Sequence, residues 1–155
     1  MSPKPDLLEG LEAGQASDLM TLAVPVSLPP GQVLFRLGEE AARLYVIQAG
    51  LITLTMPLQI AGRQEDVPID ERLPGQMVGW STLIPPHRFT LTATATIATD
   101  LLAFSRDDLL RHFEREPRVG YVVSRNIAAL VGERFDVFQA MWLRQVQQMV
   151  NASHG

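Results

Sequence analysis

The chain has 155 residues, of which 46% are hydrophobic and 19% charged, and its formal net charge at pH 7 is −4. This length and balance predict one globular domain over residues 1–155, and they exclude a disordered chain and a general nucleic-acid-binding surface. The absence of cysteine excludes disulfides, thiolate nucleophiles and iron–sulfur clusters.

Three segments with different patterns follow one another along the chain. Residues 1–22 predict a short helical segment, interrupted by two glycines, that packs on the end of a barrel. Residues 23–105 are short alternating apolar runs between glycines, prolines and charged clusters, a pattern typical of a β-barrel or sandwich, with a polar loop at residues 61–66. Residues 106–150 predict two helices.

Capping residues mark the boundaries of these two helices. Ser105 is placed so that its hydroxyl caps the first helix, and Asp108 then lies near the positive end of the helix dipole. We expect this helix to stop at Glu116. Pro117 fits the first turn of the second helix, where its missing N–H costs nothing, and that helix reaches about Val150.

The last helix carries an apolar stripe with steps of three and four residues, formed by Ile127, Val131, Phe135, Phe138, Trp142, Val146 and Met149. Between Val119 and Leu130 we interpret the helix as packing on the barrel of its own chain. Beyond that point, large apolar side chains extend past the length that a small barrel can cover, which predicts a homodimer through this helix. The expected interface residues are Phe135, Phe138, Trp142 and Met149.

Residues 75–95 have the most informative chemistry. They combine a glycine-bounded turn, a one-turn helical segment and a threonine-rich strand. Backbone N–H groups at such a turn and helix start converge on one point, where strand hydroxyls can join them, so the layout predicts a cradle for an anion. Threonine enrichment alone is also typical of ordinary β-strands.

This segment resembles the phosphate-binding cassette of the cyclic nucleotide-binding domains found in bacterial Crp/Fnr regulators and in the regulatory subunits of cyclic-AMP-dependent kinase. Residues 29–40, 42–54 and 73–79 resemble, in order and spacing, the strands and glycine turns that precede the cassette in that family. The resemblance implies a mainly β fold with flanking helices, a double-stranded β-helix (jelly-roll) barrel with a long C-terminal helix. It also implies a non-enzymatic sensor or regulatory function.

Two charged residues of the family's cassette are missing here. The family uses a glutamate to hold the ribose 2′-hydroxyl and an arginine to pair with the cyclic phosphate. Trp80 stands at the glutamate position and Phe89 at the arginine position, with Arg88 one residue early. A slip of one residue on a strand reverses the face of the side chain. The ligand site that the resemblance implies consists of Gly79, Trp80, Ser81, Thr82, Leu83, Arg88, Phe89 and Thr90.

These replacements leave the ligand and the function open. Trp80 either fills the space of a nucleotide or stacks on a purine, and we favour filling, or a changed ligand, over cyclic AMP. A ligand would be a cyclic nucleotide or another small anion. One hypothesis is a sensor that acts on a separate effector protein or through its own dimer. The other is a ligand-free dimerisation scaffold that keeps the barrel and has lost the pocket.

Several other partners are not expected. Crp/Fnr regulators carry a helix-turn-helix module after the sensor domain, whereas this chain ends directly after its last helix, so we expect no direct DNA binding. No apolar run reaches the roughly eighteen residues of a membrane span. Residues 1–10 lack the cationic stretch and apolar core of a secretion signal. We therefore expect a cytoplasmic protein without membrane contact.

An enzymatic alternative is a cupin, a related barrel that residues 29–31 and 44–50 also resemble. Cupin enzymes place a His-x-His pair and a glutamate between such segments to hold a metal, and no histidine stands there in this chain. His87, His112 and His154 are scattered, so we expect no metal and no catalytic residue. Some Crp-type sensors bind haem through a cassette-region histidine, which by resemblance makes His87 a candidate haem ligand.

Overall fold

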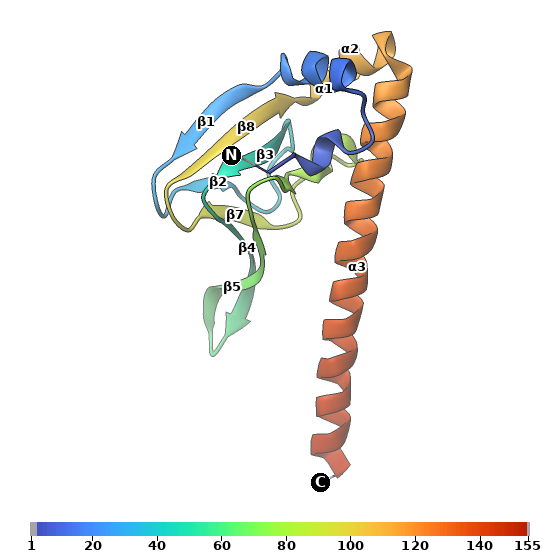
Figure 1. Ribbon diagram of the computed structural model, residues 1–155. Helices are drawn as coiled ribbons and strands as arrows, with labels where there is room; N and C mark the ends of the chain where they lie inside the picture. The colour runs from blue at the N-terminus through green and yellow to red at the C-terminus, as the bar shows by residue number, and fades with distance from the viewer. Residues whose placement is uncertain (1–2, 155) are drawn as a thin grey trace.

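The computed structural model describes residues 3–154, and its centre is a barrel of two four-stranded antiparallel sheets (Figure 1). The strands are β1 (Val24–Leu28), β2 (Val33–Phe35), β3 (Arg43–Ala49), β4 (Ile52–Ile60), β5 (Arg63–Arg72), β6 (Met77–Val78), β7 (Thr92–Ala95) and β8 (Thr99–Ser105). One sheet has the order β1-β8-β3-β6 and the other β2-β7-β4-β5. Strands that follow one another therefore often lie in opposite sheets, and the expected jelly-roll barrel is confirmed.

Strand β3 shows how the sequence alternation builds two cores. Tyr45 and Ile47 point into the space between the sheets, where they join the barrel core. Leu44 and Val46 point to the opposite face of the same strand and pack under the helices. Because both faces are buried, β3 reads as a continuous apolar run, and its pairing with β8 places it at the centre of its sheet.

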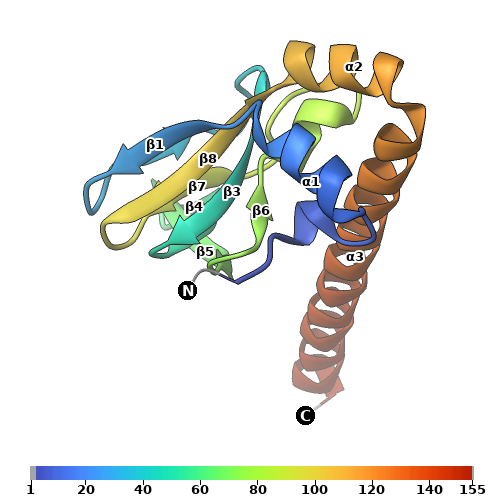
Figure 2. The same cartoon turned by 45° about the horizontal axis from the view of Figure 1, so that its top comes forward.

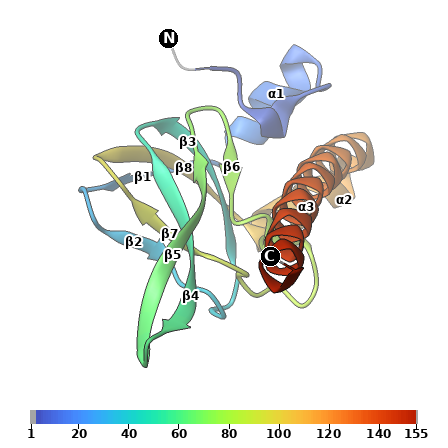
Figure 3. The same ribbon diagram turned by 90° about the horizontal axis from the view of Figure 1, so that it is seen from below.

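The helices gather on one side of the barrel, over the sheet that contains β3 (Figures 2 and 3). They are the 3-10 helix η1 (Asp6–Leu8), α1 (Ala13–Met20), the 3-10 helix η2 (Trp80–Leu83), α2 (Arg106–Arg115) and α3 (Pro117–His154). The expected N-terminal helical segment is thus η1 followed by α1, while residues 1–2 lie outside the described part. Among residues 3–154, no helix has the length and hydropathy that crossing a membrane requires.

The two C-terminal helices begin where their capping residues predict. The backbone N–H of Asp108 donates to the hydroxyl of Ser105 over 3.1 Å at the start of α2. That helix ends at Arg115 with Glu116 as its C-cap, and Pro117 opens α3. The last helix runs to His154, four residues past the expected end.

Helix α3 has two halves in different surroundings. Its first half is buried against the barrel and the other helices through Val119, Gly120, Val122, Val123, Ile127 and Leu130. From residue 132 to residue 154 no described residue is buried, although large apolar side chains continue along the helix. Figure 1 shows this second half extending well beyond the barrel. The expected packing of the first half is confirmed.

The hairpin of β4 and β5 also extends beyond the barrel, in the same direction as the second half of α3 (Figure 1). Its turn is formed by Ala61 and Gly62 alone, both with positive φ (51° and 79°), which is typical of a tight two-residue hairpin turn. The expected polar loop at residues 61–66 is therefore wrong, because β5 already begins at Arg63. A strand that projects into solvent accepts polar residues, so their presence does not indicate a loop.

Candidate ligand site: the cassette and its cavity

The cassette is built around Gly79, which lies between β6 and η2. Its φ of +81° belongs to the left-handed region, and an added Cβ would lie 3.0 Å from the carbonyl oxygen of Arg43 and 3.3 Å from the ring of Phe89. Glycine is thus required by both its conformation and its neighbours. The turn then leads into η2, where the N–H of Thr82 donates to the carbonyl of Gly79 over 3.1 Å.

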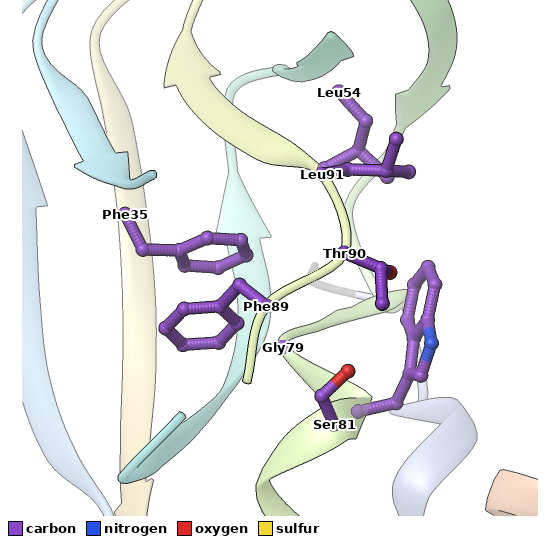
Figure 4. Close-up of a pocket in the computed structure, with 8 residues that line it drawn as sticks. Phe35, Leu54, Gly79, Ser81, Phe89, Thr90 and Leu91 are labelled. Carbon is purple, nitrogen blue, oxygen red and sulfur yellow. The ribbon is translucent and has the colours of Figure 1, made fainter. Parts of the chain in front are cut away.

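A small cavity lies behind this turn, with a volume of about 10 Å³. Its lining residues are Phe35, Leu54, Gly79, Trp80, Ser81, Phe89, Thr90 and Leu91 (Figure 4). A single water molecule needs roughly 10–15 Å³, and pockets for small-molecule ligands measure roughly 300–1,000 Å³. The space behind the cassette therefore holds no nucleotide in this conformation.

Aromatic rings occupy the space instead. The rings of Phe35, from β2, and Phe89, from the segment before β7, stack with centroids 3.7 Å apart and planes inclined by 9° (Figure 4). Tyr45 of β3 continues the stack, with its ring centroid 6.2 Å from that of Phe35. Both phenylalanines are buried in the barrel core. Phe89, the residue that the resemblance aligns with the family's arginine, is thus an apolar ring stacked in the barrel core.

Trp80 connects the cavity to the surface beside α3. It packs against the barrel core and also against the core under the helices. It lines the small cavity and, in addition, an open groove of about 390 Å³, which we call the β4 groove. The β4 groove is lined by Met56, Trp80, Thr90, Leu91, Val131, Arg134, Phe135 and Phe138. The indole therefore forms part of the wall between the filled interior and the helix.

Arg88 lies outside the cavity lining. Its guanidinium donates to the carbonyl oxygen of Gly38 over 2.9 Å, in the turn that follows β2. The neighbouring backbone is held there too, because Arg88 forms an isolated antiparallel bridge with Glu40 and the N–H of Phe89 donates to the carbonyl of Glu39. Phe89 thus points into the barrel core, while the side chain of Arg88 is exposed. Among the described residues, those that line the cavity include no charged side chain.

The structure brings five of the predicted site residues around the cavity: Gly79, Trp80, Ser81, Phe89 and Thr90. Thr82 is fully buried, and its hydroxyl has no hydrogen-bond partner among residues 3–154. Leu83 packs under the helices and lines a second groove, on the α3 side. Sequence reasoning missed Phe35, Leu54 and Leu91, which line the cavity from β2, from β4 and from the approach to β7.

An ion-pair network joins α3 to the base of the β4–β5 hairpin. A carboxylate oxygen of Asp70 lies 3.3 Å from Nη2 of Arg134 on α3 and 3.6 Å from Nη1 of Arg72. Burial lowers the pKa of the Arg72 guanidinium, and the Asp70 carboxylate opposes this effect. Nε of Arg72 also donates to the carbonyl of Met77 over 3.2 Å. Because Arg72 is almost fully buried, these partners compensate the cost of burying its charge.

The fold and the cassette agree with one known family. A model of the cyclic nucleotide-binding domain matches residues 25–116. The chain belongs to the cyclic nucleotide-binding domain family. The matched part of this cyclic nucleotide-binding domain runs from β1 to the end of α2 and includes the whole cavity, whereas α3 follows it.

Individual relatives cover different shares of the chain. It is 28% identical over 106 residues to the cyclic AMP receptor protein of Thermus thermophilus, covering 68% of this chain and 46% of that protein. It is 25% identical over 138 residues to glutaminase 1 of Bradyrhizobium diazoefficiens, covering 86% of this chain and 21% of that protein. The solved N-terminal domain of a transcriptional regulator from Streptomyces coelicolor is 26% identical with a TM-score of 0.71, covering 84% of this chain and 91% of that one. The chain thus spans less than half the length of the first two relatives.

The described part of the cyclic nucleotide-binding domain does not bring together the ligands of a metal site. Within residues 3–154, no group of three histidine, aspartate or glutamate side chains is placed to hold a metal ion. His87, the candidate haem ligand, has its Nδ1 3.3 Å from the carbonyl oxygen of Ser81, in the loop after η2. Its ring is therefore engaged with the cassette backbone.

Proposed function

We propose that this chain is a non-enzymatic regulatory domain in which the nucleotide cavity of the family is filled by the domain's own aromatic side chains. The observation that carries the proposal is the cavity of about 10 Å³ behind the stacked rings of Phe35 and Phe89. A ligand would have to displace a buried aromatic pair before it could enter. Cyclic nucleotides then do not regulate the domain, and the ligand-free scaffold becomes the favoured hypothesis.

The chemistry of the lining supports the same proposal. A cyclic phosphate in a closed site needs a charge-assisted partner, and removing such a pair loses roughly 1.5–3 kcal/mol for each hydrogen bond to the charged group. Arg88, the nearest cation in sequence, donates to Gly38 instead. Trp80 replaces the ribose acceptor with an indole that packs into both cores. Neither residue offers the nucleotide a replacement contact in this arrangement.

We further propose that the domain acts as a homodimer through the second half of α3. Phe135 and Trp142 are 59% and 65% exposed, and Met149 is as exposed as Trp142. Phe138 lies between them and is half-buried in the β4 groove. Side chains of this size are enriched at the centres of protein interfaces. The exposed stripe accounts for the length of α3 beyond the barrel, and a separate effector protein could then recognise the dimer.

Calorimetry with cyclic AMP and cyclic GMP tests the filled cavity. We expect no measurable binding up to roughly millimolar nucleotide, whereas a cyclic-AMP-binding domain of the same family, measured alongside, should bind. Submicromolar binding of cyclic AMP would refute the proposal, because it would require the stacked phenylalanines to move aside at little cost.

Light scattering tests the dimer. We expect the wild type to be dimeric at tens of micromolar and Trp142→Glu to be monomeric. Asn151→Glu adds the same charge on the opposite side of the helix and should leave the dimer intact. A monomeric wild type would refute the dimer, and a dimeric Trp142→Glu variant would place the interface elsewhere.

A further inference from the structure

The first half of α3 exposes a tyrosine between two arginines. Cζ of Arg118 lies 5.7 Å from the ring centroid of Tyr121, and Cζ of Arg125 lies 5.9 Å from it. Spacings of three and four residues place the three side chains on one face of the helix. The tyrosine is 58% exposed, and both arginines are exposed as well. We call this set the Arg–Tyr–Arg face.

The two guanidinium groups of this face carry uncompensated charge. Among residues 3–154, neither Arg118 nor Arg125 takes part in an ion pair. Between residues 117 and 132, the charged side chains of α3 are these two arginines alone. Glu114 and Glu116 precede the helix and are exposed, but neither forms an ion pair with them. The face is therefore locally positive on a chain whose net charge is −4.

Arg118 occupies a position where a helix disfavours a cation. It is the second residue of α3, whose first turn contains no acidic residue. The N-terminus of a helix carries a partial positive charge, so a cation there lowers the stability of the helix. The stability of the fold therefore does not explain this arginine. Residues that break such a local rule are expected at functional sites.

The Arg–Tyr–Arg face stands on a rigid support. Val119 and Val123, in the same turns of α3, are buried in the core under the helices. Arg125 is confined further, because its Nη2 lies 2.9 Å from the position that a Cβ on Gly10 would take, in the turn between η1 and α1. Stacking on the tyrosine ring restrains both guanidinium groups. Side chains that are already restrained lose less freedom when a partner binds.

The chemistry of this face matches a pair of carboxylates. We propose that the Arg–Tyr–Arg face binds an acidic segment of a separate effector protein. Guanidinium groups bind carboxylates in a bidentate manner, and Tyr and Arg are enriched among the residues that dominate interface energies. Arg118 and Arg125 are seven residues apart, about 10.5 Å along the helix axis. Two carboxylates three residues apart in an extended segment span about 10 Å, which matches this distance.

Nucleic acids and membranes match this face less well. A DNA-binding protein holds its polyanion through roughly six to ten phosphate contacts, whereas this face offers two guanidinium groups. The net charge of −4 also repels a large polyanion at a distance. A short segment with two carboxylates avoids this cost, because charges are screened beyond about 8 Å at physiological ionic strength.

The location of the face makes the inference independent of the filled cavity and of the proposed homodimer. Figure 1 shows the start of α3 beside α2, at the end of the molecule remote from the C-terminus and from the tip of the β4–β5 hairpin. The exposed stripe from Phe135 to Met149 therefore lies further along the same helix. An effector and a second copy of the chain can thus occupy different parts of α3.

Fluorescence anisotropy with synthetic peptides tests the proposal. The probe is a labelled peptide of about eight residues with two glutamates three positions apart among serines, and its counterpart carries glutamine at both positions. We expect the wild type to bind the glutamate peptide at least about fivefold more tightly at physiological ionic strength, as two exposed ion pairs allow. Equal affinities for the two peptides would overturn the inference.

Two double variants provide a matched comparison. Arg118→Glu with Arg125→Glu reverses both charges of the face, while Arg36→Glu with Arg63→Glu makes the same change in net charge at exposed arginines outside α3. We expect the first variant to lose the preference for the glutamate peptide and the second to keep it within about twofold. Circular dichroism checks that α3 still folds. Equal losses in both variants would show a response to net charge alone and would overturn the site.

Two further measurements separate an acidic segment from other occupants. Phosphatidylserine vesicles and a single-stranded RNA should not bind the wild type. Binding of either that Arg118→Glu with Arg125→Glu removes would overturn the acidic segment in favour of a phosphate ligand. By light scattering, the same variant should keep the mass of the wild type, and a changed mass would overturn the inference by placing this face between copies. A wild type that is monomeric but prefers the glutamate peptide would refute only the homodimer.

Discussion

The aromatic filling of the cavity predicts a large loss of stability when Phe89 is shortened to alanine. Phe89 is almost fully buried, and its ring lies flat on that of Phe35 with centroids 3.7 Å apart. Replacing a buried phenylalanine by alanine costs about 3–5 kcal/mol, depending on how far the neighbours collapse into the space. The residues around it belong to hydrogen-bonded strands and leave a cavity of only about 10 Å³ at present. We therefore expect little collapse and a loss of about 4 kcal/mol.

The measurement is urea unfolding of wild type and Phe89→Ala at one protein concentration, because dimerisation would add a concentration-dependent term to the stability. For a chain of this length, about 4 kcal/mol corresponds to a fall in Tm of roughly 8–16 °C. Tyr121→Ala is the matched control, since it removes an aromatic ring that is 58% exposed on α3. We expect that control to lose less than about 1 kcal/mol.

A second measurement uses the same variant. The space that Phe89 leaves is lined by apolar residues such as Phe35, Leu54 and Leu91, and apolar cavities of this kind bind small aromatic molecules. We expect benzene to raise the Tm of Phe89→Ala and to leave that of the wild type unchanged. A loss of stability below about 1.5 kcal/mol, without an effect of benzene, would refute the claim that Phe89 fills a closed core.

Three further comparisons test other parts of the structure by urea unfolding. Asp70→Asn should lower the free energy of unfolding by about 3 kcal/mol, because it unpairs a buried guanidinium. Glu40→Gln breaks an exposed ion pair and should lower it by less than about 1 kcal/mol. Equal losses in the two variants would contradict a stabilising role of the Asp70 network. Gly50→Ala should lose about 2 kcal/mol or more, because at φ +104° its new Cβ would lie 2.6 Å from a carbonyl oxygen. Gly14 lies on α1 with open space around it, so Gly14→Ala should raise the free energy of unfolding by about 0.5–1 kcal/mol. A Gly50→Ala variant more stable than Gly14→Ala would contradict the strain assigned to Gly50. Ser105→Ala should lose about 1 kcal/mol through its lost cap, and no loss would show that the hydrogen bond is replaced by water.

Features that depend on a few neighbouring residues could be predicted from the sequence. The cap at Ser105 and the helix start at Pro117 follow from local hydrogen bonding and backbone geometry, and both are confirmed. The packed first half and the exposed second half of α3 could be told apart from the sequence, because the apolar stripe is longer than any barrel that a chain of this length can form. The loop at residues 61–66 was wrong for a related reason, since polarity reports exposure to water and not the end of a strand.

The filling of the cavity could be predicted only in part. The alternation of side chains on a strand already indicates that Phe89 and Arg88 face opposite ways, as they do. The partner of Phe89 could not be found from the sequence, because Phe35 is 54 residues away. The two rings meet through the pairing of β2 with β7 and the hydrogen bonds that join Phe89 to the turn after β2, and the β2–β7 ladder contains a register shift. Such a shift changes which side chains oppose one another without leaving a recognisable pattern in the residues.

The stacked phenylalanines also change the kind of equilibrium that governs this barrel. In a domain that binds a ligand, a separate molecule occupies the interior, so occupancy depends on the concentration of that molecule. Its association also costs roughly 4–15 kcal/mol of free energy, because translational and rotational freedom is lost. Here the occupying rings belong to the polypeptide, so their entry is unimolecular and complete whenever the chain is folded. If the proposed function holds, a rise or fall in the concentration of a cyclic nucleotide leaves the conformation of this domain unchanged.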